Sequence, residues 1–269
     1  SYNSWWGFYT LPTVNKMDPA FLDYIIDSED SVVAHWLKLG ADGFRLDVAD
    51  ELPDGFLDAL RRAAKAEKTD ALVLGEVWED ATNKISYGSR RRFLRGRQLD
   101  SVMNYPFANA IVDFVKNGNS QGLLNTVLNI LENYPPQAVK LLMNHIGTHD
   151  TARILTVLAS DMSNTGDRKW QSEQYLSNEQ YEKGVKLLKL AAVLQFTLPG
   201  VPSVYYGDEA GVEGYGDPFC RSCFPWDRMD EVDPQSRMRN HIKSLIHLRK
   251  SSKAFSVGEM ECAYAIDNT

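Results

Sequence analysis

Residues 43–48 read Gly-Phe-Arg-Leu-Asp-Val, a stretch typical of a short buried β-strand with charged residues toward its end. Because side chains alternate along a strand, Arg45 and Asp47 share one face and the three apolar side chains share the other. The apolar face can pack on helices while the charged pair faces the interior of a barrel. A guanidinium beside Asp47 favours the ionised carboxylate, which suits a nucleophile. The alternative is a buried ion pair that only fixes the sheet.

Strand patterns and helix patterns alternate on both sides of this stretch. The strand patterns cover 43–48, 71–77, 101–103, 139–146 and 203–206. The helix patterns cover about 28–39, 55–63, 108–116, 122–134, 152–158, 178–196 and 234–249. This alternation predicts an α/β protein with a parallel sheet. A complete (β/α)8 barrel takes about 250 residues, but only five strand-then-helix units can be read, so we expect part of a TIM (β/α)8 barrel.

A second carboxylate follows the next predicted strand. Residues 72–78 read Leu-Val-Leu-Gly-Glu-Val-Trp, which places Glu76 near the carboxyl end of that strand. Desolvation at the end of an apolar face disfavours the ionised form, so Glu76 could donate a proton near neutral pH. The alternative is a glutamate that simply reaches solvent at a strand end.

A third carboxylate, Asp150, stands just beyond the turn at Gly147. It could merely cap the helix that follows. However, all three acids come at the carboxyl ends of predicted strands, where barrel enzymes keep their active sites. A nucleophilic carboxylate and a proton-donating carboxyl group are the pair that cleavage of a glycosidic bond requires. Seven aromatic residues could stack on sugar rings, although each by itself is better explained as core: Trp5, Trp6, Tyr9, Trp78, Tyr105, Tyr205 and Tyr206.

The composition excludes several other functions. The chain has 269 residues, 43% hydrophobic, with a net charge of −7, which argues against nucleic acid as a partner. A basic run opposes this locally, and we interpret it as a solvated face: Arg90, Arg91, Arg92, Arg95 and Arg97. No stretch approaches the roughly 20 apolar residues of a membrane span, so no membrane partner is expected. Three cysteines, Cys220, Cys223 and Cys262, form no disulfide framework and supply too few ligands for structural zinc, so no metal site is predicted.

Five motifs in order along the chain resemble the alpha-amylase family, within it the branch of cyclomaltodextrinases, neopullulanases and maltogenic amylases. They are LPTVN at 11–15, GFRLDVADE at 43–51, GEVWEDA at 75–81, GTHDT at 147–151 and PGVPSVYYGDE at 199–209. The resemblance implies that Asp47 is the nucleophile, Glu76 the general acid/base and Asp150 the acid that stabilises the transition state.

The resemblance also implies a set of substrate-binding residues. Arg45 and His149 correspond to partners at the cleavage subsite, and Asp217 and Arg221 to residues that hold the next sugar. Glu51 matches a position associated with the specificity of the branch, and Trp78 is the aromatic neighbour of Glu76.

The implied activity is cleavage of alpha-1,4 links, with alpha-1,6 links in some members, in maltooligosaccharides, cyclodextrins or related alpha-glucans, with retention of the anomer. Two alternatives remain open. One is a glucanotransferase that uses the same site, and the other is a non-catalytic alpha-glucan-binding relative.

The ends of the chain depart from the family pattern. The chain opens at Ser1, after the family's third-strand motif, and 263–269 alternate like a strand cut short. We therefore expect residues 1–253 to hold strands 4 to 8 of the barrel, truncated at both ends, and 254–269 to begin a C-terminal β-sandwich. Calcium is the cofactor that the family would suggest, but its usual ligand region is missing. Besides the alpha-glucan, the expected partner is a second copy in a homodimer or the missing N-terminal part, without which this segment should be inactive. The resemblance implies a cytoplasmic location.

Overall fold

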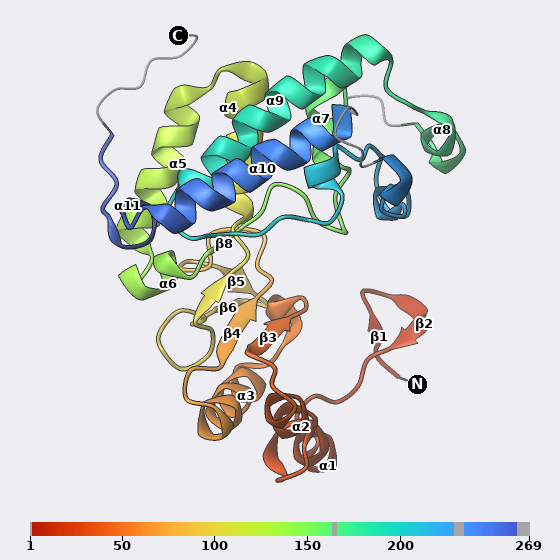
Figure 1. The fold of residues 1–269 in the computed structure, drawn as a ribbon. Helices are drawn as coiled ribbons and strands as arrows, with labels where there is room; N and C mark the ends of the chain where they lie inside the picture. Colours follow the sequence, from red (N-terminus) through yellow and green to blue (C-terminus); the bar gives the residue numbers. More distant parts are fainter. Residues whose placement is uncertain (1, 163–165, 229–233, 263–269) are drawn as a thin grey trace. The chain divides into compact units, whose positions relative to one another are not determined.

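The computed structural model describes residues 2–162, 166–228 and 234–262 of the chain. Its contacts divide into two compact units, Ser1–Val102 and Met103–Thr269 (Figure 1). Each unit is described by itself.

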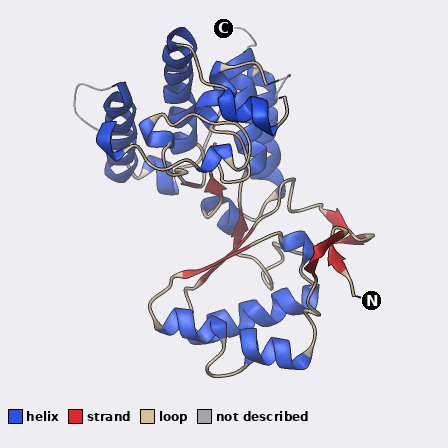
Figure 2. Cartoon of the chain, turned by 90° about the vertical axis from the view of Figure 1, so that its right-hand side faces the viewer, coloured by secondary structure: helices blue, strands red, loops and turns tan. Residues whose placement is uncertain are grey.

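The first unit is built on three parallel strands in the order β3-β4-β7. Its elements are β1 (Ser4–Trp5), β2 (Phe8–Pro12), α1 (Pro19–Leu22), the π-helix η1 (Asp23–Asp27), α2 (Val32–Lys38), β3 (Gly43–Leu46), the 3-10 turn η2 (Ala49–Glu51), α3 (Asp54–Glu67), β4 (Leu72–Gly75), β5 (Ile85–Ser86), β6 (Ser89–Arg90) and β7 (Ser101–Val102). Two antiparallel hairpins, β1-β2 and β5-β6, each form a separate two-stranded sheet. The strands are red in Figure 2.

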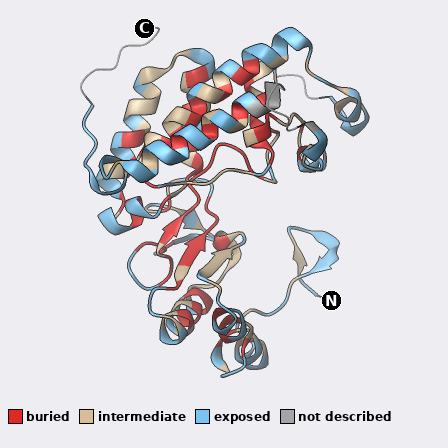
Figure 3. Ribbon diagram, in the orientation of Figure 1, coloured by how far each residue is buried: buried red, intermediate tan, exposed pale blue. Residues whose placement is uncertain are grey.

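Helices α2 and α3 pack together in this unit (Figure 1). Apolar residues at helical spacing on α3, among them Leu57, Leu60 and Ala64, are buried. Helix α2 starts later than the sequence pattern predicted, because the Ser31 hydroxyl accepts the Ala34 N–H at 3.3 Å and so caps the helix there. Central strand β4 is buried on both faces, as Figure 3 shows.

The second unit is mainly helical. Its elements are α4 (Tyr105–Asn117), α5 (Ser120–Asn133), α6 (Pro136–Lys140), β8 (Met143–Asn144), α7 (Ile154–Ala159), α8 (Arg168–Glu173), α9 (Asn178–Thr197), β9 (Val201–Pro202), η3 (Asp208–Ala210), η4 (Phe219–Arg221), η5 (Trp226–Arg228), α10 (Pro234–Ser251) and α11 (Ala254–Val257). Strands β8 and β9 are parallel, and Met103 forms a parallel bridge to Met143. Helix α9 packs against α4, α7 and α10, and the residues it buries among them are red in Figure 3.

The parallel strand pairs and the helices between them confirm an α/β fold, although β4 is followed by the β5-β6 hairpin and not by a helix. Two predicted strands differ from the structure. The strand predicted over 139–146 is wrong at its start, because the chain forms α6 through Lys140 and pairs only at β8. The strand predicted over 203–206 lies earlier, at β9, where the Val201 N–H donates to Leu142 O at 2.7 Å. Of the predicted sandwich start, 254–257 form helix α11, and 263–269 lie outside the described residues.

Candidate active site

The carboxylates Asp47 and Glu76 follow neighbouring parallel strands. The register pairs Leu46 of β3 with Gly75 of β4, so each acid comes directly after its strand ends. The Glu76 N–H still donates to Leu46 O at 3.0 Å, which continues the pairing past the assigned strands. Because parallel strands end at one edge of a sheet, the two acids are brought to the same edge.

One guanidinium contacts both acids. Arg45 Nη1 lies 2.5 Å from Asp47 Oδ1, and Arg45 Nη2 lies 3.1 Å from Glu76 Oε2. The two carboxylates differ sharply in exposure, since the side chain of Asp47 is 74% exposed and that of Glu76 is 4% exposed. Asp47 is therefore open to a ligand, while Glu76 is enclosed by protein.

The buried carboxylate of Glu76 is held by three donors. Besides Arg45, the Val48 N–H donates to Oε2 at 2.8 Å and the Trp78 indole N–H donates to Oε1 at 3.1 Å. Val48 has a φ of 41°, in the left-handed region that β-branched residues rarely adopt, and this bend directs its amide at the acid. The expected burial of Glu76 is present, and these three donors satisfy its carboxylate oxygens.

Glu51, in the loop that follows β3, accepts hydrogen bonds from the turns of both hairpins. The Trp6 indole N–H donates to Glu51 Oε1 at 3.0 Å, and the Tyr87 hydroxyl donates to the same oxygen at 2.6 Å. Both aromatic residues have positive φ, 45° and 51°, and both precede a glycine in the hairpin turn. The hydrogen bond to the Glu51 carboxylate raises the pKa of Tyr87. The sequence analysis did not select Tyr87; the local signal that could have found the turn is Gly88, whose φ is 74°.

In the second unit, four of the predicted site residues form one cluster. His149 Nε2 lies 3.2 Å from Asp150 Oδ2, and Arg221 Nη2 lies 3.5 Å from Asp150 Oδ1. Arg221 Nε lies 2.7 Å from Asp217 Oδ1 and also donates to His149 O at 3.1 Å. Asp150 does not cap a helix here; its own N–H donates to the Thr148 hydroxyl at 3.2 Å, and α7 begins four residues later.

The second unit also contains a buried ion pair that the sequence analysis missed. Arg153 Nη1 is 3.3 Å from Asp208 Oδ1, and the guanidinium lies over the rings of Tyr205 and Tyr206 at 4.3 and 4.6 Å. Burial raises the pKa of Asp208 to about 7 and that of Tyr205 to about 12. A Cβ at Gly147 would lie 2.4 Å from Asp208 Oδ2, so only glycine fits the turn. Asp208 lies in the motif at 199–209, but the sequence gives no sign that it pairs with Arg153.

The remaining aromatic candidates divide between core and surface. Tyr105 is 3% exposed and contacts the His145 ring edge-on at 4.5 Å, as expected of a core residue. Trp5 and Trp6 stack on each other at 5.3 Å, and Tyr9 is 78% exposed. Trp78 and Tyr206 are exposed as well, so the exposed candidates are Trp6 and Tyr9 on the β1-β2 hairpin and these two residues elsewhere.

Metal and membrane features were searched over the described part of the chain. There, no group of three or more histidine, cysteine or acidic side chains could hold a metal ion. Cys220 is buried, Cys223 and Cys262 are exposed, and all three are free thiols. None of the described helices combines the length and apolar character needed to cross a membrane.

Comparisons with known proteins agree with this geometry. Residues 5–252 match the family model described as "Alpha amylase, catalytic domain". An amylopullulanase of Thermoanaerobacter thermohydrosulfuricus is 35% identical over 98% of the chain and 18% of its own length. A cyclomaltodextrinase of Geobacillus thermopakistaniensis is 34% identical over 96% of the chain and 38% of its own length.

A solved cyclomaltodextrinase structure superimposes with a TM-score of 0.78 at 32% identity, over the whole chain and 40% of the solved chain. The chain therefore spans less than half the length of these relatives.

Proposed function

Because the chain belongs to the alpha-amylase family of glycoside hydrolases, we propose that this protein cleaves alpha-1,4 glucosidic bonds in alpha-glucans and retains the configuration of the anomeric carbon. Maltooligosaccharides and cyclodextrins are the substrates we propose, with alpha-1,6 links as a secondary target. The names of the relatives support this choice, since they include cyclomaltodextrinases and a neopullulanase.

One observation carries the proposal. The Arg45 guanidinium contacts both Asp47 and Glu76, so an exposed carboxylate and a buried carboxylate meet at one sheet edge. Retaining glycosidases need this pair about 5 to 5.5 Å apart, with one acid as nucleophile and the other as proton donor. The difference in exposure assigns the roles that we propose, because the open Asp47 can reach a sugar carbon and the enclosed Glu76 is sheltered from bulk water.

The proposed reaction has two steps. Asp47 attacks the anomeric carbon while Glu76 gives its proton to the leaving glycosidic oxygen, so a glucosyl ester forms on Asp47 as the glycosidic bond breaks. Glu76 then takes a proton from water, whose oxygen attacks the anomeric carbon and frees Asp47. Arg45 contacts both acids and holds them in place for the first step. We assign to Asp150, oriented by His149 and Arg221, the binding of sugar hydroxyls.

Substitution of the two acids tests the proposal. Asp47→Asn and Glu76→Gln should each lower kcat on maltotriose and on β-cyclodextrin by about 10³-fold or more, since each removes one chemical role. Asp42→Asn is the matched control, because it makes the same change at an exposed aspartate that directly precedes β3. It should leave kcat unchanged. The first product released by the unaltered protein should be the alpha anomer in NMR spectra. A beta anomer, or full activity of either acid variant, would reject the assignment.

The same site could pass the glucosyl group to a sugar hydroxyl in place of water. With labelled glucose as acceptor, a hydrolase forms mainly unlabelled products. Dominant labelled products would identify a glucanotransferase instead, and tight maltooligosaccharide binding without any turnover would identify a non-catalytic relative.

We also infer that residues 1–253 supply strands 4 to 8 of a TIM barrel and that 254–269 begin a β-sandwich. The parallel strand pairs and the TM-score of 0.78 to a cyclomaltodextrinase support the first part. A homodimer and a cytoplasmic location are proposed from the resemblance to the branch alone. Light scattering of the full-length protein would test the dimer.

A further inference from the structure

Aromatic residues from the turns of the β1-β2 and β5-β6 hairpins converge on one carboxylate. The Trp6 indole N–H donates to Glu51 Oε1 at 3.0 Å, and the Tyr87 hydroxyl lies 2.6 Å from Oε1 and 2.5 Å from Oε2 of the same side chain. Three segments that lie 36 residues or more apart in the chain therefore meet at Glu51.

A short chain of hydrogen bonds connects Glu51 to the proposed acid/base. The Glu51 N–H donates to Val48 O at 2.9 Å, and the Val48 N–H donates to Glu76 Oε2 at 2.8 Å. Residues 49–51 form a 3-10 turn, and its rise of about 2 Å per residue separates Val48 from Glu51 by about 6 Å along the axis. Glu51 thus lies one turn from the acid/base, where the sugar next to the cleaved one can reach it.

The two aromatic donors have strained backbone conformations. Trp6 has a φ of 45° and Tyr87 a φ of 51°, in the left-handed region that residues with large side chains rarely adopt. Strain of this kind persists where other contacts hold it, and it is concentrated at functional sites. An aromatic residue at both positions, where asparagine or glycine would relieve the strain, indicates a role for the aromatic side chain.

Neither ring fills the core. Tyr87 is 76% exposed and Trp6 is 67% exposed, although Trp5 stacks on Trp6 with 5.3 Å between the ring centroids. Among the described residues, Glu51 Oε2 accepts a hydrogen bond from Tyr87 alone. An ionised carboxylate oxygen can accept a further donor, so Glu51 can bind a sugar hydroxyl between two aromatic side chains that remain open to solvent.

The base of the β5-β6 hairpin is held by other contacts. Ser86 Oγ donates to Asp50 O at 3.1 Å, and Arg91 Nη1 donates to the same oxygen at 3.3 Å. The hairpin therefore keeps its base when the Tyr87 hydroxyl is removed, and only its tip is freed from Glu51. The hydroxyl acts on the Glu51 carboxylate more than on the packing of the hairpin.

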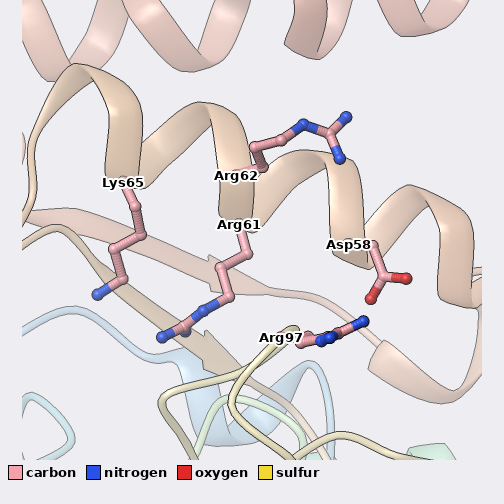
Figure 4. A pocket seen from close by; sticks show the side chains of 5 residues that line it. All are labelled: Asp58, Arg61, Arg62, Lys65 and Arg97. Atoms are coloured by element: carbon pink, nitrogen blue, oxygen red, sulfur yellow. The ribbon is translucent and has the colours of Figure 1, made fainter.

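A basic pocket in the same unit lacks these features. It has a volume of about 340 Å³ and is lined by Asp58, Arg61, Arg62, Lys65 and Arg97 (Figure 4). None of these lining residues is aromatic, and Arg61 Nη1 is already paired with Asp100 Oδ1 at 2.7 Å. The pocket therefore offers a sugar no ring face, in contrast to the residues around Glu51.

From these contacts we propose that Tyr87 and Trp6 position the Glu51 carboxylate to accept hydroxyl groups of the sugar unit next to the cleaved bond. Tyr87 is then a specificity-determining residue for that unit. The inference rests on the proposed function for its substrate, an alpha-glucan.

Kinetics of the full-length protein on two substrates test the inference. Maltotriose has sugars next to the cleaved unit, whereas para-nitrophenyl alpha-glucoside has none. Tyr87→Phe removes the hydroxyl and keeps the ring, so the ratio of kcat/KM for maltotriose to kcat/KM for the glucoside should fall about tenfold, as expected for one hydrogen bond to a charged group. Most of the fall should come from a higher KM for maltotriose. Tyr175→Phe, at a tyrosine that is 78% exposed, is the matched control and should leave the ratio unchanged.

A double-mutant cycle tests whether Tyr87 acts through Glu51. Glu51→Ala should lower the ratio at least as much as Tyr87→Phe, and Tyr87→Phe should add nothing in the Glu51→Ala background. Additive losses would overturn the positioning role, and so would an equal ratio in the unaltered protein and in Tyr87→Phe. Thermal unfolding of each variant verifies that it is folded.

Failure of the proposed function has a different signature, because the unaltered protein would then hydrolyse neither substrate. In that case titration calorimetry with maltotriose tests the inference, and Tyr87→Phe should weaken binding about tenfold. No binding of maltotriose by the unaltered protein, or equal affinities of the two proteins, would overturn the inference.

Discussion

At the scale of single residues, Arg45 links the two acids that the sequence selected separately. Its planar guanidinium uses different nitrogens for Asp47 and Glu76, which a lysine ammonium could not do with the same geometry. The exposed acid gains a fixed position from this contact, and the buried acid gains one of its three donors. The relative placement of the pair therefore depends on the shape of the cation as well as its charge.

Arg45→Lys should accordingly lower kcat by about 10- to 100-fold, because small displacements of reacting groups are costly. The charge is retained, so KM should change less than kcat. Steady-state kinetics on maltotriose give both constants, and Arg95→Lys serves as the control for an exposed arginine. An equal rise in KM with unchanged kcat would mean that Arg45 binds sugar and does not position the acids.

Asp208 gives a residue-scale prediction on pH. Burial raises its pKa in the folded protein to about 7, above the roughly 3.9 of an unfolded chain. The folded state therefore holds the extra proton between these values, and its free energy of unfolding should fall as pH rises from about 4 to about 7, by at most about 4 kcal/mol. Asp208→Asn should lack this component.

Urea unfolding of both proteins at pH 5 and pH 8 measures the difference. The free energy of unfolding should drop between these pH values more in the unaltered protein than in Asp208→Asn. Asp30→Asn, at an exposed site, should follow the unaltered protein. Parallel pH curves for all three would show that Arg153 keeps Asp208 ionised throughout.

At the scale of elements, two hairpins form hydrogen bonds to the same residue, Glu51. The turns of β1-β2 and β5-β6 each place an aromatic residue in a positive-φ position, and both aromatic donors reach the Glu51 carboxylate. Glu51 itself lies in the 3-10 turn that follows β3 and Asp47 in the chain. The position of the aromatic hairpins is thus coupled to the loop that carries Asp47.

Glu51→Ala should release both hairpins, whereas Tyr87→Phe should release only β5-β6. Loss of one hydrogen bond to a charged group corresponds to a rise in local hydrogen exchange of about tenfold. Exchange measured by mass spectrometry on peptides covering 4–12 and 85–90 separates the two cases. Faster hydrogen exchange over 4–12 in Tyr87→Phe would show that the two hairpins do not bind Glu51 independently.

At the scale of the molecule, the first unit presents much apolar surface. Large side chains such as those of Tyr24, Trp36 and Leu39 are more than half exposed. Strand β3 ends the three-stranded sheet of the described residues, and strand edges and apolar patches of this kind are usually covered by further structure. These features support our proposal that additional chain or a partner completes the barrel.

The 269-residue chain alone should therefore show at most about 1% of the maltotriose activity of a longer protein that contains it. Its apolar surface should bind a hydrophobic dye, and the fluorescence should fall when the barrel is complete. Comparable activity of the short and long proteins in the same assay would show that these residues suffice for catalysis.

The sequence by itself determined the α/β alternation, the strand after which each acid comes and most helices, because hydrophobic period and turn residues are local signals. It did not determine where short strands pair: Pro136 and the close approach of Gly200 to Leu142 moved the ends of β8 and β9. Tertiary structure alone decided that Arg45 contacts both acids and that Tyr87 and Trp6 meet on Glu51. The physical reason is that hydrogen bonds and ion pairs between distant residues depend on backbone direction and side-chain rotamer, neither of which leaves a periodic trace in the sequence.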